Sequence, residues 1–223
     1  MDYIRKNSFR PASAIASGLV EIATDAEQAT GDSDSVVSTP GTVFAIYGYD
    51  TIWVPSTAMT AKTTSGATYG EKELATNDIM KCYYSFDNQS EQFVMFDIVM
   101  PENWDRGAIR AKFYWAPSDD SGTVAKTVEW ELGGVAVSND DAMDVNITGA
   151  QVIFDTILAG ENADLHISDT TPAITIAGTP ALGDLIQFEA SRNISGTDDY
   201  TTAALLFGIL IQYKVGNTVA VWS

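Results

Sequence analysis

The sequence predicts an all-β protein: an antiparallel β-sandwich of jelly-roll type, preceded by an extended N-terminal arm. Several short runs alternate apolar and polar residues with a period of two, as strands with one buried face do. Clusters rich in Gly, Pro, Asn, Asp and Ser separate these runs, and hardly any run has the helical period. About nine short strands at this spacing are typical of two packed antiparallel sheets.

The chain divides into three regions of different composition. Residues 1–42 form an arm and a short module, which ends at a turn-forming cluster around Pro40. Residues 43–77 include a stretch rich in Thr, Ala, Ser and Gly and are expected to form an irregular connecting or edge segment. Residues 78–223 carry the repeated strand pattern and are expected to form the sandwich.

Within the third region, each expected strand follows from its own pattern. Runs that alternate strictly predict strands with one wet and one dry face, and runs that are apolar on both faces predict central or covered strands. The pattern leaves the strand order open. The expected strands are residues 80–86, 93–100, 109–115, 128–132, 151–158, 165–167, 174–176, 185–190 and 204–213.

Length, charge and cysteine content limit the possible functions. The 223 residues, 45% of them hydrophobic, suffice for one β domain with an extension. The formal charge of −18 argues against a nucleic-acid partner, which needs clustered Lys and Arg. No apolar run approaches the roughly 18 residues of a membrane span, and residues 1–13 lack a secretory h-region, so we expect no membrane partner and synthesis in the cytoplasm. Cys82 is the only cysteine, which excludes an intrachain disulfide.

The N-terminus is a basic arm on an acidic chain. Arg5, Lys6 and Arg10 are 3 of the 12 basic residues and lie within the first ten positions. One interpretation is a tether that binds an acidic patch of a larger assembly or of a neighbouring subunit. The alternative is a frayed, solvated terminus. The sequence leaves both open.

Residues 18–40 resemble a short module of tailed-bacteriophage fibres and related virion proteins. The chain departs from the module at residues 36–38, where Val-Val-Ser replaces the usual Arg-Ala-Val, and it contains one copy, so no long repetitive shaft is encoded. The resemblance implies a virion part. It depends on Gly18, Val20, Glu21, Ala23, Thr24, Glu27, Gly31, Asp34, Thr39 and Pro40.

A second resemblance covers about half of the chain and is weaker. The runs at 111–115, 128–132, 164–168, 183–186 and 206–209 look like a β-sandwich domain common in uncharacterised phage structural proteins. These runs are mostly core and turn residues. The resemblance therefore implies a fold and carries no inherited active site.

Candidate catalytic groups are few. His166 is the only histidine, and it is expected to be a half-exposed structural residue between two apolar neighbours. Cys82 alternates with large apolar residues and is expected to be a small core hydrophobe. Glu129 and Glu131 are about 7 Å apart by strand geometry, within the range of glycosidase carboxylates, but alternating Glu is also typical of a solvated strand face. We predict no catalytic residue, cofactor or metal site.

Three Asp-rich loops could bind calcium, which takes six to eight oxygen ligands. They lie at residues 119–120, 140–144 and 198–199, and none has the spacing of an EF-hand. Solvated turns that carry the net charge are the favoured interpretation.

These observations predict a non-enzymatic virion structural protein on the exterior of a phage particle, either a capsid decoration or cement protein or a short tail-fibre or tail-tip subunit. Its expected partners are the major capsid protein or tail proteins, two further copies in a homotrimer, and a host-surface glycan. The alternative is a carbohydrate-binding or carbohydrate-cleaving appendage domain, which would need exposed aromatic residues beside a groove. The residues expected to serve attachment or assembly are Arg5, Lys6, Arg10, Gly18, Leu19, Val20, Ile22, Pro40 and Trp53. Trp104 and Trp222 are further large groups outside the clearest strands, available for a subunit contact or for the core.

Overall fold

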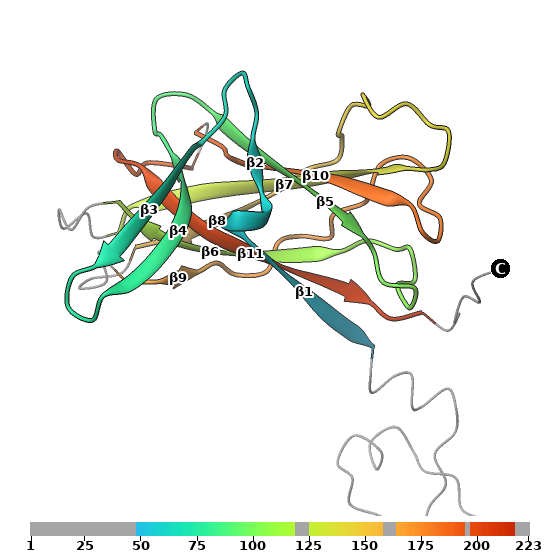
Figure 1. Cartoon of the computed structure of the whole chain (residues 1–223), viewed down its shortest axis with the longest axis horizontal. Coiled ribbons are helices and arrows are strands. Elements are labelled where there is room, and N and C mark those ends of the chain that lie inside the picture. Colours follow the sequence, from blue (N-terminus) through green and yellow to red (C-terminus); the bar gives the residue numbers. More distant parts are fainter. Residues whose placement is uncertain (1–47, 119–124, 158–163, 195–196, 217–223) are drawn as a thin grey trace, which may run out of the picture. The chain divides into compact units, whose positions relative to one another are not determined.

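A computed structural model of the chain describes residues 48–118, 125–157, 164–194 and 197–216 (Figure 1). The chain separates into two units, residues 1–48 and 49–223. The second unit is a sandwich of two antiparallel sheets, and the expected arm and module fall outside the described residues. No helix in the described part of the chain is long and apolar enough to cross a membrane.

The first sheet has the strand order β3-β4-β11-β6-β9, and β1 also pairs with β11. The second sheet has the order β2-β5-β10-β7-β8. Every strand pair is antiparallel, which confirms the predicted jelly-roll-like β-sandwich. The first sheet contains β1 (Tyr49–Pro55), β3 (Thr68–Leu74), β4 (Ile79–Phe86), β6 (Arg110–Pro117), β9 (His166–Ile167) and β11 (Ala204–Lys214). The second contains β2 (Thr60–Ala61), β5 (Gln92–Val99), β7 (Thr127–Val137), β8 (Gln151–Thr156) and β10 (Leu185–Arg192).

The sandwich begins at β1, earlier than the expected boundary at residue 78. The segment expected to be irregular or an edge contributes β1, β2 and β3, with the 3-10 helix η2 (Ser56–Ala58) between β1 and β2. Strands β2 and β3 do lie at sheet edges. Strand β1 pairs with β11 along seven residues, although its run Ile52-Trp53-Val54 is apolar throughout and shows no alternation.

One expected strand, residues 174–176, is not a strand in the structure. Ile174 exchanges backbone hydrogen bonds with Ile109, next to β6 of the first sheet, whereas Ala177 bonds to Gly134 and Ala136 of β7 in the second sheet. The segment therefore crosses from one sheet to the other. It forms only isolated bridges because it stays beside neither sheet long enough to build a ladder.

Aromatic side chains fill the space between the sheets. Trp130 of β7 is stacked on Phe113 of β6, with ring centroids 5.4 Å apart, and meets the ring of Phe86 at its edge at 5.2 Å. Trp104, which the sequence left as either a contact or a core residue, is 3% exposed and belongs to the core. Each such side chain contributes roughly 1.5–3 kcal/mol through burial.

An ion pair is also buried at one end of the sandwich. Arg192 at the end of β10 is 0% exposed and donates Nε and Nη2 to the two carboxylate oxygens of Asp198, at 2.8 Å each. Its remaining donors reach the backbone carbonyls of Phe86, Tyr200 and Thr202. The guanidinium thereby connects β4 and β10 to the segment that leads into β11.

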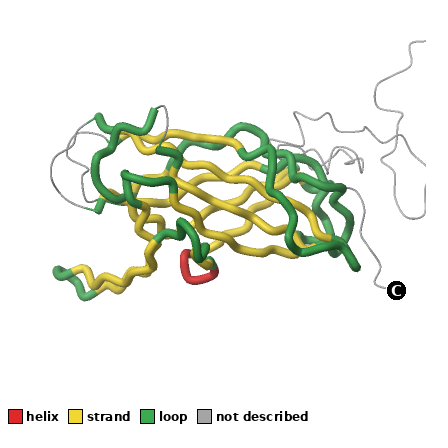
Figure 2. The backbone as a smooth tube through the Cα atoms, turned by 90° about the horizontal axis from the view of Figure 1, so that it is seen from above, coloured by secondary structure: helices red, strands yellow, loops and turns green. Residues whose placement is uncertain are grey.

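The β3–β4 hairpin extends beyond the body of the first sheet. β11 pairs with β4 only at Tyr84–Phe86, whereas β3 accompanies β4 from Ile79 to Ser85. The outer half of the hairpin is therefore a two-stranded ribbon, and Figure 2 shows it projecting away from the sandwich beside η2.

Candidate functional site

A groove of about 550 Å³ opens on the outer face of the first sheet. It lies where two strands part along one side of β11: β4 pairs with Ala204–Leu206, and β1 pairs with Gly208–Lys214. A register shift between Leu206 and Gly208 places Phe207 at this division. The volume is within the range of small-ligand sites, about 300–1,000 Å³.

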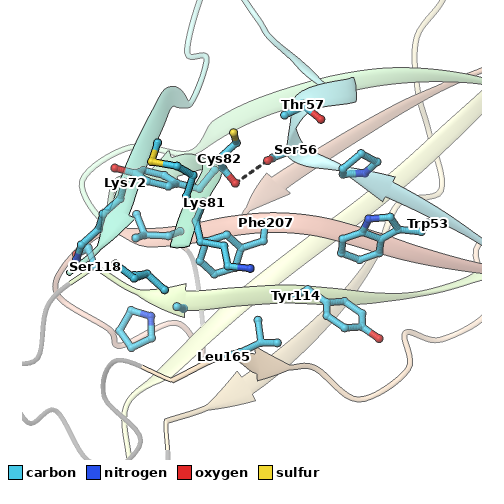
Figure 3. Close-up of a pocket in the computed structure, with 17 residues that line it drawn as sticks. Trp53, Ser56, Thr57, Lys72, Lys81, Cys82, Tyr114, Ser118, Leu165 and Phe207 are labelled. Carbon is cyan, nitrogen blue, oxygen red and sulfur yellow. Dashed lines mark hydrogen bonds between the residues drawn. The ribbon is translucent and has the colours of Figure 1, made fainter. Parts of the chain in front are cut away.

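Trp53 of β1 is the largest exposed side chain of the groove (Figure 3). Its neighbour Val54 is buried, so the alternation of the strand turns the indole outward, where it is 46% exposed. A Cβ at Gly208 would lie 2.4 and 2.5 Å from two carbons of the indole ring. The missing side chain at Gly208 therefore lets the indole lie directly against β11.

Tyr114 of β6 holds the indole from the other side. Gly208 is the register partner of both Pro55 in β1 and Tyr114 in β6, so the indole of Trp53 reaches across the glycine to the phenol. The two ring centroids are 4.9 Å apart with an interplanar angle of 79°, the favourable edge-to-face arrangement. The indole is thus positioned before any ligand arrives.

A second aromatic pair lies on the β4 side of the groove. Tyr83 and Phe207 meet edge to face with centroids 6.5 Å apart. The ring of Tyr83 covers Gly70 on β3, where a Cβ would lie 2.7 Å from ring carbons. Both aromatic pairs therefore depend on a glycine in the neighbouring strand.

Polar groups are placed at the margin of the groove. The hydroxyl of Ser56 in η2 donates to the backbone carbonyl of Cys82 at 2.8 Å and ties the helix to β4 (Figure 3). Lys72 and Lys81 come from the hairpin, and Ser118 comes from the end of β6. Lys72, Lys81 and Ser118 offer hydrogen-bond donors beside apolar ring surfaces.

Of the expected attachment residues, the structure describes Trp53 alone. It lies in the groove on a regular strand, which periodicity could not indicate because the run around it is apolar throughout. Trp222 also lies outside the described residues. The remaining expected attachment residues lie outside the described residues as well: Arg5, Lys6, Arg10, Gly18, Leu19, Val20, Ile22 and Pro40.

The expectation of a half-exposed histidine is wrong. His166 is 7% exposed and is stacked on Trp115 with centroids 4.9 Å apart, whereas its neighbours Leu165 and Ile167 are the exposed residues. The predicted alternation of buried and exposed residues along this strand is correct, but the histidine lies on the buried face and its apolar neighbours lie on the exposed face. Cys82, expected in the core, is half-buried at the groove.

The two candidate carboxylates are less solvated than expected. Glu129 is buried and Glu131 is half-buried on β7, in the second sheet and therefore on a different sheet from the groove. Burial raises the pKa of Glu131, and the negative charges of Glu91, Glu129 and Glu189 raise it further. These glutamates form an acidic cluster with no part in the groove.

In the Asp-rich loops that the structure describes, several carboxylates bind groups of the protein itself. Asp198 binds Arg192, and Asp199 binds Lys126 at 2.9 Å. Asp141 accepts from the backbone nitrogen of Ser138. Within the described residues no group of three or more His, Cys, Asp or Glu side chains could hold a metal ion. Residues 119–120 lie outside the described ranges.

No family model and no curated protein matches this chain in sequence. Among solved structures, it is similar to a family 11 carbohydrate-binding module from Clostridium thermocellum in complex with a mixed-linked tetrasaccharide, at 9% identity over 76% of this chain and 96% of that one, with a TM-score of 0.37. A mannan-recognising carbohydrate-binding module gives 9% identity over 74% and 98%, with a TM-score of 0.38.

An arabinose-bound GH51 α-L-arabinofuranosidase gives 8% identity and a TM-score of 0.42 over 70% of this chain, which spans 23% of that enzyme. TM-scores of this size assign neither a family nor a ligand to the protein. The groove of the first sheet is therefore the feature that indicates a function.

Proposed function

We propose that the β-sandwich is a non-enzymatic carbohydrate-binding domain whose ligand lies in the aromatic groove of the first sheet. The observation that carries this proposal is the indole of Trp53, exposed to solvent yet held against Gly208 and the ring of Tyr114. A flat ring in this setting offers an apolar surface to the C–H face of a sugar, and the hydroxyls around that face need donors and acceptors at the margin.

Pre-organisation matters because a sugar offers little apolar area. Ordering a side chain on binding costs about 0.5–1.5 kcal/mol, and a ring already fixed by its neighbours avoids most of that cost. Two aromatic pairs, Trp53–Tyr114 and Tyr83–Phe207, flank the register shift in β11. They provide ring surfaces on both sides of the groove.

Binding to a panel of immobilised polysaccharides tests the proposal, with Trp53→Ala as the diagnostic variant. Removing the indole should weaken glycan binding by about 2 kcal/mol, roughly thirtyfold in Kd, because it removes the main stacking surface. Tyr49→Ala is the matched control: Tyr49 lies on the same strand and is 64% exposed, but it is not among the groove residues. Absence of binding to every polysaccharide, or equal loss in both variants, would contradict the proposal.

A second candidate is the virion structural role, with residues 1–42 as the attachment segment and the sandwich as the outward part. The observation in its favour is exposed apolar surface at both margins of the first sheet. Leu74, Ile79 and Met80 are exposed near the end of the β3–β4 hairpin, and Leu165 and Ile167 are exposed at β9. Such surface is typical of protein–protein contacts.

Immunogold electron microscopy of intact particles, with an antibody against the sandwich, tests this second role. Label over the head supports a decoration or cement protein, and label at the tail supports a fibre or tip subunit. Particles that carry no label would contradict a virion location. The two candidates are compatible, since a virion appendage that binds a host glycan would satisfy both.

A further inference from the structure

We propose that the groove selects acidic glycans, in which a carboxylate or sulfate on the sugar lies between Lys72 and Lys81. This inference rests on the proposed carbohydrate-binding function and names the class of its ligand. It starts from the pairing of the β3–β4 hairpin. Lys72 and Lys81 are direct register partners, and both line the groove (Figure 3).

Direct partners in an antiparallel pair point to the same face of the sheet, with Cβ atoms about 4.5–5.5 Å apart. Like charges in this position are destabilising. The alternation of the strand also places acidic and basic side chains of the hairpin on different faces. Glu71 and Glu73 flank Lys72 in β3 and therefore point to the opposite face. The groove face of the hairpin therefore carries two positive charges and the other face carries the acids.

Neither lysine is neutralised within the described structure. The ion pairs formed there are Lys62–Glu189, Lys126–Asp199, Arg192–Asp198 and Lys214–Asp105. The described residues that line the groove include no Asp or Glu, in a chain with 30 acidic and 12 basic residues. An anion held between the two lysines would remove their mutual repulsion.

Because the whole chain is strongly acidic, a preference for acidic glycans would point to a local positive site. A formal charge of −18 repels a polyanion at long range. Any preference of the protein for the charged form of a glycan must therefore come from a local positive site. The aromatic pairs supply stacking that is indifferent to charge, so the lysines alone decide between the acidic and neutral forms of one backbone.

The test uses the full chain and two matched ligand pairs in isothermal titration calorimetry. The first pair is oligogalacturonate and its carboxyl-reduced counterpart, and the second is a sulfated galactan oligosaccharide and its desulfated counterpart. The wild type should bind at least one acidic form about five- to tenfold more tightly than its neutral counterpart, as expected for two partly exposed ion pairs. The pair that shows the preference identifies whether carboxylate or sulfate is recognised.

The diagnostic variant is Lys72→Gln with Lys81→Gln. It should lose the preference, measured as the ratio of the Kd values of the neutral and acidic forms within this variant, and at low salt it should favour the neutral form because only the repulsion of the whole chain remains. Arg106→Gln with Lys214→Gln removes the same charge at exposed positions outside the groove and should leave the preference unchanged.

Equal binding of acidic and neutral forms by the wild type would overturn this inference and leave the proposed function intact. A preference that survives in the double lysine variant, or disappears in the control, would also overturn it. Failure of all four ligands and of the wider polysaccharide panel would overturn the inference and the proposed function together.

Discussion

Gly208 is the residue on which the arrangement of the groove depends most directly. It lies in β11 between Pro55 and Tyr114, and the indole of Trp53 occupies the space that a side chain at this position would fill. A glycine inside a strand normally weakens it, because it offers no side chain to pack. Here the indole of Trp53 replaces the missing contact, which is the arrangement known as aromatic rescue.

Gly208→Ala should therefore displace Trp53. The added methyl would overlap the indole and approach the carbonyl oxygen of Val54 at 2.7 Å, and we expect a destabilisation of about 1–3 kcal/mol together with weaker glycan binding. Chemical denaturation and calorimetry measure the two effects. The cost should be smaller in a Trp53→Ala background, where the ring is absent. Strict additivity of the two substitutions would show that the indole does not pack on Gly208.

At the scale of elements, charged residues hold strands and loops in two different ways. Arg192 is fully buried and binds Asp198 through two hydrogen bonds, so the pair is rigid and shielded from water. Lys126 and Asp199, in contrast, form a pair of which both members are more than a third exposed. Breaking the buried ion pair should therefore lower the stability more than breaking the exposed one.

Asp198→Asn should destabilise the sandwich by about 3–5 kcal/mol, because Arg192 would remain buried without its counter-charge. Lys126→Gln, which breaks the exposed pair, should cost less than about 1 kcal/mol. Urea denaturation of both variants gives the comparison. Similar costs for the two substitutions would contradict the buried position of Arg192.

The acidic cluster on the second sheet predicts a dependence of stability on pH. The pKa of Glu131 is raised in the folded protein by burial and by three neighbouring glutamates. The folded state then binds more protons than the unfolded state between the unfolded pKa, about 4.3, and the higher folded pKa. Stability attributable to Glu131 should fall as the pH rises through that window.

Glu131→Gln should accordingly raise the melting temperature at pH 7, and the gain should disappear below about pH 4, where the native carboxyl is protonated in both states. Differential scanning calorimetry at several pH values measures it. Glu73→Gln, at an exposed position of β3, is the matched control for the change in net charge. A gain that is independent of pH would contradict the explanation by repulsion and burial.

At the scale of the whole molecule, the sandwich and the N-terminal segment are separate units. All residues that line the groove belong to the unit that begins at Tyr49. Attachment and ligand binding are therefore proposed for different parts of the chain.

The expected homotrimer is also a property of the whole molecule. A mass of one subunit by light scattering at micromolar concentration would contradict it.

Deletion of residues 1–42 should leave the melting temperature of the sandwich and its glycan affinity unchanged, because strands after Gly48 build the core and the groove. Deletion of residues 1–9 should abolish incorporation into particles if the basic arm is the tether. Thermal denaturation, calorimetry and particle blots measure these outcomes. Normal incorporation of the variant that lacks residues 1–9 would contradict the tether. Loss of glycan affinity on deletion of residues 1–42 would contradict the assignment of ligand binding to the sandwich alone.

The sequence by itself determined the all-β class and most strands of residues 78–223, because a strand with one buried face must repeat every two residues. It also identified Trp53 as a large group in need of a contact. It could not find β1, whose apolar run hides the alternation, nor the direction in which His166 points, because a period of two is the same for both faces of a strand.

Only the tertiary structure determined where the groove lies and which residues line it. The groove brings together residues from β1, β3, β4, β6 and β11. Some of these residues, such as Lys72 and Phe207, are more than 130 positions apart in the sequence. The pairing of β11 with both β1 and β4 creates the opening, and the register of the hairpin sets two lysines opposite each other. Strand order and register are properties of long-range pairing. No local pattern in the sequence records them.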